Sequence, residues 1–163
     1  MKEIFTRRSI RKYTKDPVSE VDIQLLLRAA MAAPSACNQQ PWEFVVTDNP
    51  ATIKALCRCS AFANFATKAP LMIVPCMRKN CRLPAFAPVD LSAATQNLLL
   101  EANHLGLGAC WIGMYPQTTR RQAVHQLLNL PDNLDVFALV AVGHPAQQLD
   151  PVDRYEEKRI HRV

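Results

Sequence analysis

The residues with the clearest potential for chemistry lie near the start of the chain. Three guanidinium groups and one hydroxyl fall within five positions there: Arg7, Arg8, Ser9 and Arg11. A guanidinium group is planar and carries five N–H donors, so it can bind two phosphate oxygens at once. This segment therefore predicts a site for a ligand that carries phosphate. Taken alone, it also fits a basic terminus that is simply solvated.

A second polar segment, from Pro34 to Trp42, connects a predicted helix to a predicted strand. Pro34 and Pro41 stiffen it, because proline fixes φ and resists helix formation. Asn38 and Gln40 each offer N–H donors and a carbonyl acceptor, which is what the edge of a planar heterocycle requires. The composition also fits an ordinary helix-to-strand connector. Together with the arginines, however, it predicts a pocket for a phosphorylated heteroaromatic ligand.

Several other kinds of site are excluded by spacing. Gly106 and Gly108 follow a predicted helix and precede a predicted strand, whereas a dinucleotide-binding fingerprint needs its glycines between a strand and a helix. The sequence contains no Walker A motif and no G-x-S-x-G motif. The four histidines and six cysteines lack the common metal and redox spacings. We therefore expect no bound metal and six reduced thiols, with a metal or iron–sulfur site as the alternative.

Composition bounds the class of protein. The chain has 163 residues, 49% of them hydrophobic, which is enough for one globular domain over residues 1–163. The longest unbroken apolar run, Val136 to Val142, is too short to span a bilayer. No apolar signal core follows the N-terminal methionine. These features predict a cytoplasmic protein without a membrane partner.

The net charge of +5 favours an anionic partner, and nucleic acid is one candidate. Surfaces that bind nucleic acid usually interleave basic and aromatic residues. Here aromatic residues make up only 7% of the chain, and the basic residues gather mainly at its two ends. We expect a small anionic ligand and no nucleic-acid partner.

Hydrophobic periodicity and capping signals predict the elements that position these segments. Four helices are expected. The first begins at Ser19 and is ended by Pro34, and the second follows Asn49-Pro50. The third covers 91–105, capped by Asp90 and ended by Gly106, and the fourth runs from a capping box at Thr119 to about Leu130. Four strands are expected, at 42–47, 71–76, 110–114 and 136–142. Residues 77–89 lack a clear period and form either a lid or a surface excursion. The alternation of helix and strand predicts a three-layer α/β or α+β domain.

Three motifs occur in a fixed order along the chain: R-R-S-I-R at 7–11, A-P-S-A-x-N-x-Q-P-W at 33–42 and G-L-G-x-x-W-I-G at 106–113. With them, the chain resembles the nitroreductase family of FMN-dependent oxidoreductases from Phe5 to its tail. The tail over 153–161 resembles the basic C-terminal segment of that family. The resemblance implies an α+β fold, with three α/β/α layers around a central mixed sheet. It also implies an intertwined homodimer with FMN at the subunit interface.

The resemblance implies specific residues for FMN. Arg7, Arg8, Ser9 and Arg11 fall on the family's FMN-binding segment, where Arg7 and Arg11 would contact phosphate and ribityl and Ser9 the polar edge of the ring. The second subunit would contribute Pro34, Ser35, Ala36 and Asn38, with Gln40 close by. Backbone beside the isoalloxazine would come from Ile112 and Gly113, and the tail would offer Arg154 to the phosphate.

The implied activity passes a hydride from NADH or NADPH to an electron-poor acceptor, such as a nitroaromatic or a quinone, by ping-pong turnover. The flavin carries the chemistry, so no side chain is assigned as catalytic. One alternative is a specialised flavoenzyme of the family, such as a dehydrogenase, a dehalogenase or a flavin-cleaving enzyme. Another is a basic module that binds anions or nucleic acid without catalysis. The region over 77–89 is compact, which leaves the acceptor open.

Overall fold

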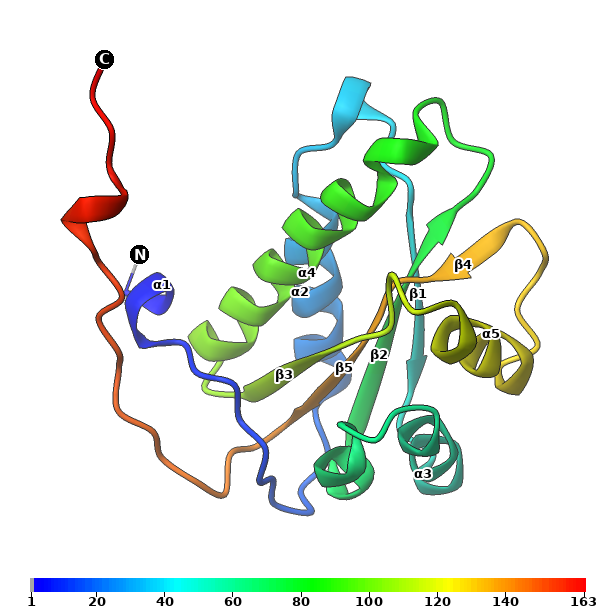
Figure 1. Ribbon diagram of the computed structural model, residues 1–163. Coiled ribbons are helices and arrows are strands. Elements are labelled where there is room, and N and C mark those ends of the chain that lie inside the picture. Colours follow the sequence, from blue (N-terminus) through cyan, green and yellow to red (C-terminus); the bar gives the residue numbers. More distant parts are fainter. Residues whose placement is uncertain (1) are drawn as a thin grey trace.

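The computed structural model describes residues 2–163 (Figure 1). Its helices and strands, in chain order, are α1 (Glu3–Thr6), α2 (Glu20–Met31), β1 (Trp42–Thr47), α3 (Pro50–Arg58), β2 (Leu71–Arg78), α4 (Ala87–His104), β3 (Gly108–Gly113), α5 (Thr118–Leu127), β4 (Leu134–Val136) and β5 (Ala138–Gly143). Short 3-10 turns lie at Ala36–Asn38, Asn64–Lys68, Pro84–Phe86 and Glu157–Arg159. Among residues 2–163, no helix combines the length and the apolar character needed to cross a membrane.

The strands form one five-stranded sheet in the order β1-β2-β5-β3, with β4 paired to β2. Every strand pair in it is antiparallel. The predicted mixed sheet is therefore wrong for the described residues, whose one parallel contact is an isolated bridge between Ser9 and Ala109. The reason is the path of the chain: Thr47, at the end of β1, lies opposite Met72, near the start of β2. The connection through α3 stays at that end of the sheet and makes no parallel crossover.

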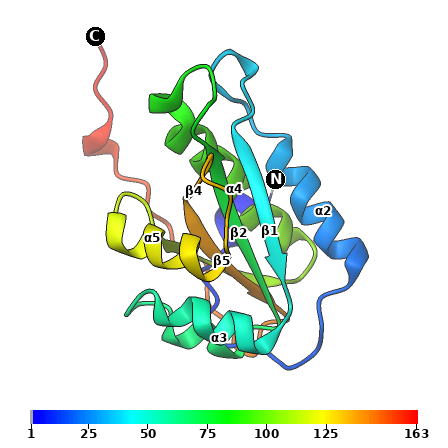
Figure 2. The ribbon, with the colours of Figure 1, turned by 90° about the vertical axis from the view of Figure 1, so that its right-hand side faces the viewer.

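Helices cover both faces of the sheet, α2 and α4 on one side and α3 and α5 on the other (Figures 1 and 2). Successive side chains of β2 point to opposite faces, as the pleat requires. Ile73 joins the apolar cluster that contains Leu98 of α4, whereas Val74 joins the cluster that contains Leu56 of α3. This is the three-layer α/β/α arrangement that the sequence predicts.

Several local predictions are confirmed. Ser19 caps α2, because its hydroxyl accepts a hydrogen bond from the backbone N–H of Asp22 at 3.1 Å. Helix α3 begins at Pro50, as predicted, and the side chain of Asn49 caps it. Strand β1 has the predicted bounds, and Gly106 follows α4 with a φ of 74°. Helix α2 ends at Met31, however, so the chain leaves the helix before Pro34 is reached.

Two helix starts differ from the prediction. Helix α4 begins at Ala87, because Pro88 fits the first turn of a helix, where no N–H is needed. Asp90 is therefore inside the helix and does not cap it. Helix α5 begins after Gln117 with no side-chain cap, and the predicted capping box at Thr119 does not form.

Some strand ends also differ from the prediction, because hydrogen bonds to partner strands determine where those strands begin and end. The predicted strand over 136–142 is divided into β4 and β5 at Phe137. The Phe137 N–H donates to the carbonyl of Pro75, while its own carbonyl accepts from the N–H groups of Met114 and Tyr115. Strand β3 begins at Gly108, two residues before the predicted start, where it pairs with the end of β5. Helix α5 ends at Leu127, three residues earlier than expected.

The chain before α2 lies against the ends of β3 and β5. The N–H of Ile10 donates to the carbonyl of Ala109 at 3.1 Å. The Tyr13 hydroxyl lies 2.5 Å from the carbonyl oxygen of Ile10 and 3.3 Å from that of Ala141. A Cβ atom at Gly108 would stand 2.6 Å from Cγ2 of Ile10, so only glycine leaves room for this contact.

Replacing this glycine tests the contact. Gly108→Ala should lower the free energy of unfolding by about 1–3 kcal/mol, because the added methyl overpacks against Ile10. Chemical denaturation measures the change. Gly113→Ala is the matched control, since its Cβ would meet no atom closer than the Tyr115 carbonyl oxygen at 3.8 Å. Equal losses in both variants would contradict the steric explanation.

Candidate functional site

Residues 7–11, here called the arginine segment, lie along the outer edge of β3. Ser9 is paired with Ala109, as described above. The Ala109 carbonyl therefore faces outward, and the backbone groups of Trp111 and Gly113 point the same way, since alternate residues of a strand share an orientation. Gly113 itself is exposed, whereas Ile112 is buried. The predicted contacts at positions 112 and 113 thus lie on β3, the strand that the arginine segment contacts at Ala109.

The arginines differ in what they already bind. Arg8 donates to the backbone carbonyl of Asp150, and Arg11 is exposed, with its guanidinium carbon 5.7 Å from the centre of the Phe65 ring. Arg7 is half-buried, and its Nε has no hydrogen-bond partner among the described residues. An unpaired buried N–H is costly, so this atom favours a ligand that brings an acceptor oxygen.

Two hollows flank the arginine segment. One of about 160 Å³ is lined by Arg7, Arg8 and Asn103 among others. The other, of about 620 Å³, includes Arg11 in its wall. The same wall contains groups that the sequence analysis missed: Lys12, Asn64, Phe65 and Lys68. Lys12 could have been found, because it directly follows the R-R-S-I-R motif.

The arginine segment also changes the electrostatics beneath it. Burial raises the pKa of the Cys110 thiol. The charges of Arg11 and Arg7 and a hydrogen bond with Ser9 act in the opposite direction. Because the pKa of Cys110 is raised on balance, burial outweighs the nearby positive charges.

Residues 34–40, here called the polar loop, have an unusual backbone. Cys37, Asn38 and Gln40 have φ values of 50°, 51° and 46°, in the left-handed region that non-glycine residues rarely adopt. The side chains of Asn38 and Gln40 make no hydrogen bond within the described part of the chain, and both residues are exposed. Ser35, in contrast, accepts a hydrogen bond from the Gln40 N–H at 2.9 Å. The loop therefore presents the free carboxamides of Asn38 and Gln40 on a backbone that is fixed by a hydrogen bond to Ser35.

The polar loop does not reach the arginine segment in one copy of the chain. Thr6, next to the segment, hydrogen-bonds to Asn103 near the C-terminal end of α4. Ala36 of the loop hydrogen-bonds to Asp90 near its N-terminal end. At 1.5 Å per residue, these two points of α4 are about 20 Å apart. The structure thus places Arg7, Arg8, Ser9 and Arg11 near the Gly108 end of β3, with Ile112 and Gly113 at the opposite end of that strand. It holds Pro34, Ser35, Ala36, Asn38 and Gln40 elsewhere, near the N-terminal end of α4.

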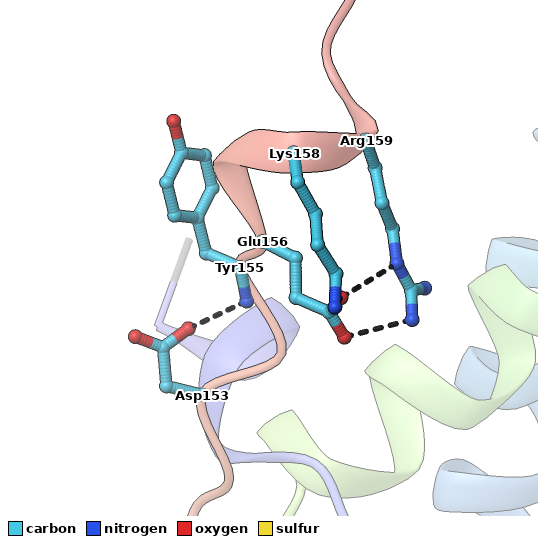
Figure 3. Close-up of polar contacts among 5 residues, drawn as sticks. All are labelled: Asp153, Tyr155, Glu156, Lys158 and Arg159. Atoms are coloured by element: carbon cyan, nitrogen blue, oxygen red, sulfur yellow. Dashed lines mark hydrogen bonds and ion pairs between the residues drawn. The ribbon is translucent and has the colours of Figure 1, made fainter.

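The C-terminal tail runs past α1 and extends away from the body (Figure 1). Arg154 is exposed there and makes no hydrogen bond or ion pair among residues 2–163. Its neighbours satisfy one another: Glu156 accepts from Arg159 at 2.7 Å and pairs with Lys158 at 3.2 Å (Figure 3). Within one copy, Arg154 therefore stays free for an anionic partner.

The donor groups at the two places suit a ligand that joins phosphate to a planar heterocycle. Guanidinium groups and the unpaired Arg7 Nε suit phosphate or hydroxyl oxygens. The free carboxamides of the polar loop suit a ring edge that alternates donors and acceptors. Within residues 2–163, no group of three or more His, Cys, Asp or Glu residues is arranged to hold a metal ion.

Comparison with known proteins decides the family. The model described as the nitroreductase family matches residues 4–63 and 58–144, which is most of the chain. The chain belongs to the nitroreductase family. A relative from Archaeoglobus fulgidus, provisionally named NADH dehydrogenase/NAD(P)H nitroreductase, is 41% identical, with 99% of this chain and 96% of the relative covered. The chain is thus a nitroreductase-family NAD(P)H oxidoreductase.

Solved structures agree with this membership. A provisionally named NADH oxidase from Clostridium acetobutylicum gives a TM-score of 0.95 at 41% identity, covering 98% of this chain and 97% of that one. A provisionally named nitroreductase from Desulfovibrio desulfuricans, solved in complex with FMN, gives 0.85 at 30% identity, covering 99% and 95%. The α+β nitroreductase-like fold expected from the sequence is confirmed.

All six cysteines of this nitroreductase-family chain are free thiols, in very different surroundings. Cys37, on the polar loop, is exposed. Burial raises the pKa of Cys57 to about 11 and that of Cys76 to about 12. Because the thiolate is the reactive form, the buried thiols are protected from alkylation in two ways: reagents cannot reach them, and their raised pKa values keep them protonated.

Alkylation tests this difference. Iodoacetamide at mildly alkaline pH should label Cys37 in the native protein, while Cys57 and Cys76 stay unlabelled until the chain is denatured. Mass spectrometry of tryptic peptides measures each site. Labelling of Cys76 as fast as that of Cys37 would contradict the burial of β2.

Proposed function

We propose that this chain binds FMN and uses it to pass electrons from NADH or NADPH to an electron-poor acceptor such as a nitroaromatic or a quinone. The observation that carries the proposal is the arginine segment beside β3, where the Arg7 Nε is buried without a partner. Family membership and the FMN-bound relative support it.

The chain's own residues bind and orient the cofactor. Arg7 and Arg11 hold the phosphate and ribityl oxygens, with Arg8 beside them. Ser9 meets the polar edge of the ring, and the backbone at Ile112 and Gly113 lies beside it. When bound, FMN supplies the hydride and electron transfer, and the protein supplies position and charge. The guanidinium groups favour negative charge on the ligand because they are positively charged.

A second copy of the chain completes the site. The polar loop lies about 20 Å along α4 from the arginine segment, by the helical rise of 1.5 Å per residue. In a homodimer, the loop of one subunit lies against the flavin of the other, so Pro34, Ser35, Ala36 and Asn38 form its second wall, with Gln40 close by. The exposed Arg154 of the tail is then free to reach phosphate. No nucleic acid is needed to explain the basic groups.

Spectroscopy tests the cofactor and the activity. The purified protein, supplied with FMN, should be yellow, and its visible absorbance should bleach under anaerobic NADH or NADPH and return when a quinone or a nitrofuran is added. Light scattering should give a dimer. A colourless protein that ignores added FMN would overturn the proposal, and a salt-dependent gel shift with DNA or RNA would favour a binding module instead.

Asn38→Ala tests the polar loop. We expect FMN affinity to fall by about tenfold, because a hydrogen bond between the ring edge and the carboxamide is lost. Fluorescence quenching of FMN measures the affinity. Asn129→Ala is the matched control, since Asn129 also has a left-handed φ, of 48°, but lies at the end of α5. If both variants bind FMN as the parent protein does, Asn38 is not a ligand contact.

A further inference from the structure

Asp90 is a buried carboxylate that the family motifs do not include. Its residue is 5% exposed, in the first turns of α4. Oδ1 accepts from the N–H of Ala36 at 2.9 Å, and Oδ2 accepts from Nε2 of Gln39 at 2.7 Å. Both carboxylate oxygens therefore hold the polar loop, and neither caps the helix.

Gln39 is the second part of this connection. Its Nε2 also donates to the Leu83 carbonyl at 3.2 Å, and its Oε1 accepts from the Leu83 N–H at 2.8 Å. Both N–H groups of the carboxamide and its oxygen are thus used. The side chain of Gln39 joins the polar loop to Asp90 on one side and to the 77–89 region on the other.

The backbone that Asp90 and Gln39 hold is the strained part of the polar loop. Three of the four residues from Cys37 to Gln40 have left-handed φ values, and such a conformation persists only where surrounding contacts impose it. Arg78 adds a further restraint, because its Nη2 donates to the carbonyls of Gln39 and Gln40 at 3.3 and 2.7 Å. Asn38 lies between the restraints at Ala36 and Gln39, and the backbone of Gln40 is itself held by Arg78.

We propose that Asp90, acting through Gln39 and the Ala36 N–H, is a positioning residue for cofactor binding. It holds the polar loop in the conformation that presents Asn38 to the flavin of the second subunit. This inference rests on the proposed function for its effect on FMN. The restraint on the loop itself is a property of the chain without any ligand.

The shared side chain of Gln39 has a second consequence. The 77–89 region, whose role as a lid or a surface excursion the sequence left open, is tied at Leu83 to the same carboxamide that holds the loop. A displacement of Leu83 therefore releases a restraint on the loop. We expect changes in this region to alter FMN affinity.

A charge exchange tests the proposal. Asp90→Asn places an amide N–H against Gln39 Nε2, and Gln39→Glu places a carboxylate against Asp90. Each single variant should therefore bind FMN at least about tenfold more weakly, since a hydrogen bond to a charged group is lost. The double variant restores the hydrogen bond between positions 39 and 90 with reversed polarity, but it leaves a carboxylate oxygen against the Leu83 carbonyl, so it should recover part of the affinity. Asp48→Asn, which removes an exposed carboxylate after β1, is the matched control.

A second measurement needs no cofactor. In FMN-free protein, the amides of residues 35–40 should exchange hydrogen faster in Asp90→Asn than in the parent, while the thermal midpoint changes by only a few degrees. Unchanged exchange in this variant would overturn the proposal, as would a loss of FMN affinity that the double variant fails to rescue. If the exchange effect is present but the parent binds no FMN, the proposed function fails and the link to the cofactor fails with it. If the parent binds FMN and Asp90→Asn binds it equally well, only this inference fails.

Discussion

The packing of helix α4 determines where the candidate ligand-binding residues of this chain lie. Leu91, Leu98 and Ala102 are completely buried between α2 and the sheet, so the helix cannot tilt or slide without opening the core. The arginine segment is attached near one end of this rigid helix and the polar loop near the other. The separation between them is therefore a fixed property of the core, and it supports our proposal of a homodimer, which the family resemblance implies.

Several groups of the candidate site are held in place by neighbouring residues before a ligand binds. Gly108 lets Ile10 pack closely onto β3, which sets the path of the arginine segment. Asp90, Gln39 and Arg78 hold the polar loop in a backbone conformation that it would not keep in isolation. A preorganised site loses less conformational entropy on binding, so under our proposal these supporting contacts would raise the affinity for FMN without touching it.

Much of the fold could be predicted from local sequence signals. The cap at Ser19, the bounds of β1 and the left-handed Gly106 depend on neighbouring residues alone, and each is as expected. The errors have a common cause. A parallel or antiparallel pairing and the division of a strand at Phe137 depend on backbone hydrogen bonds to residues distant in the chain. Local periodicity carries no information about such partners.

By itself, the sequence determined the chemistry of the candidate site, because guanidinium groups, carboxamides and their spacing within each motif are local. It also indicated the family, through three motifs in order. Only the tertiary structure decided which of these groups meet. The bond between Ala36 and Asp90 spans 54 positions, and the free Nε of Arg7 appears only once the surrounding core is packed. Such contacts depend on how the helices pack on the sheet, and no single segment of the sequence specifies this packing.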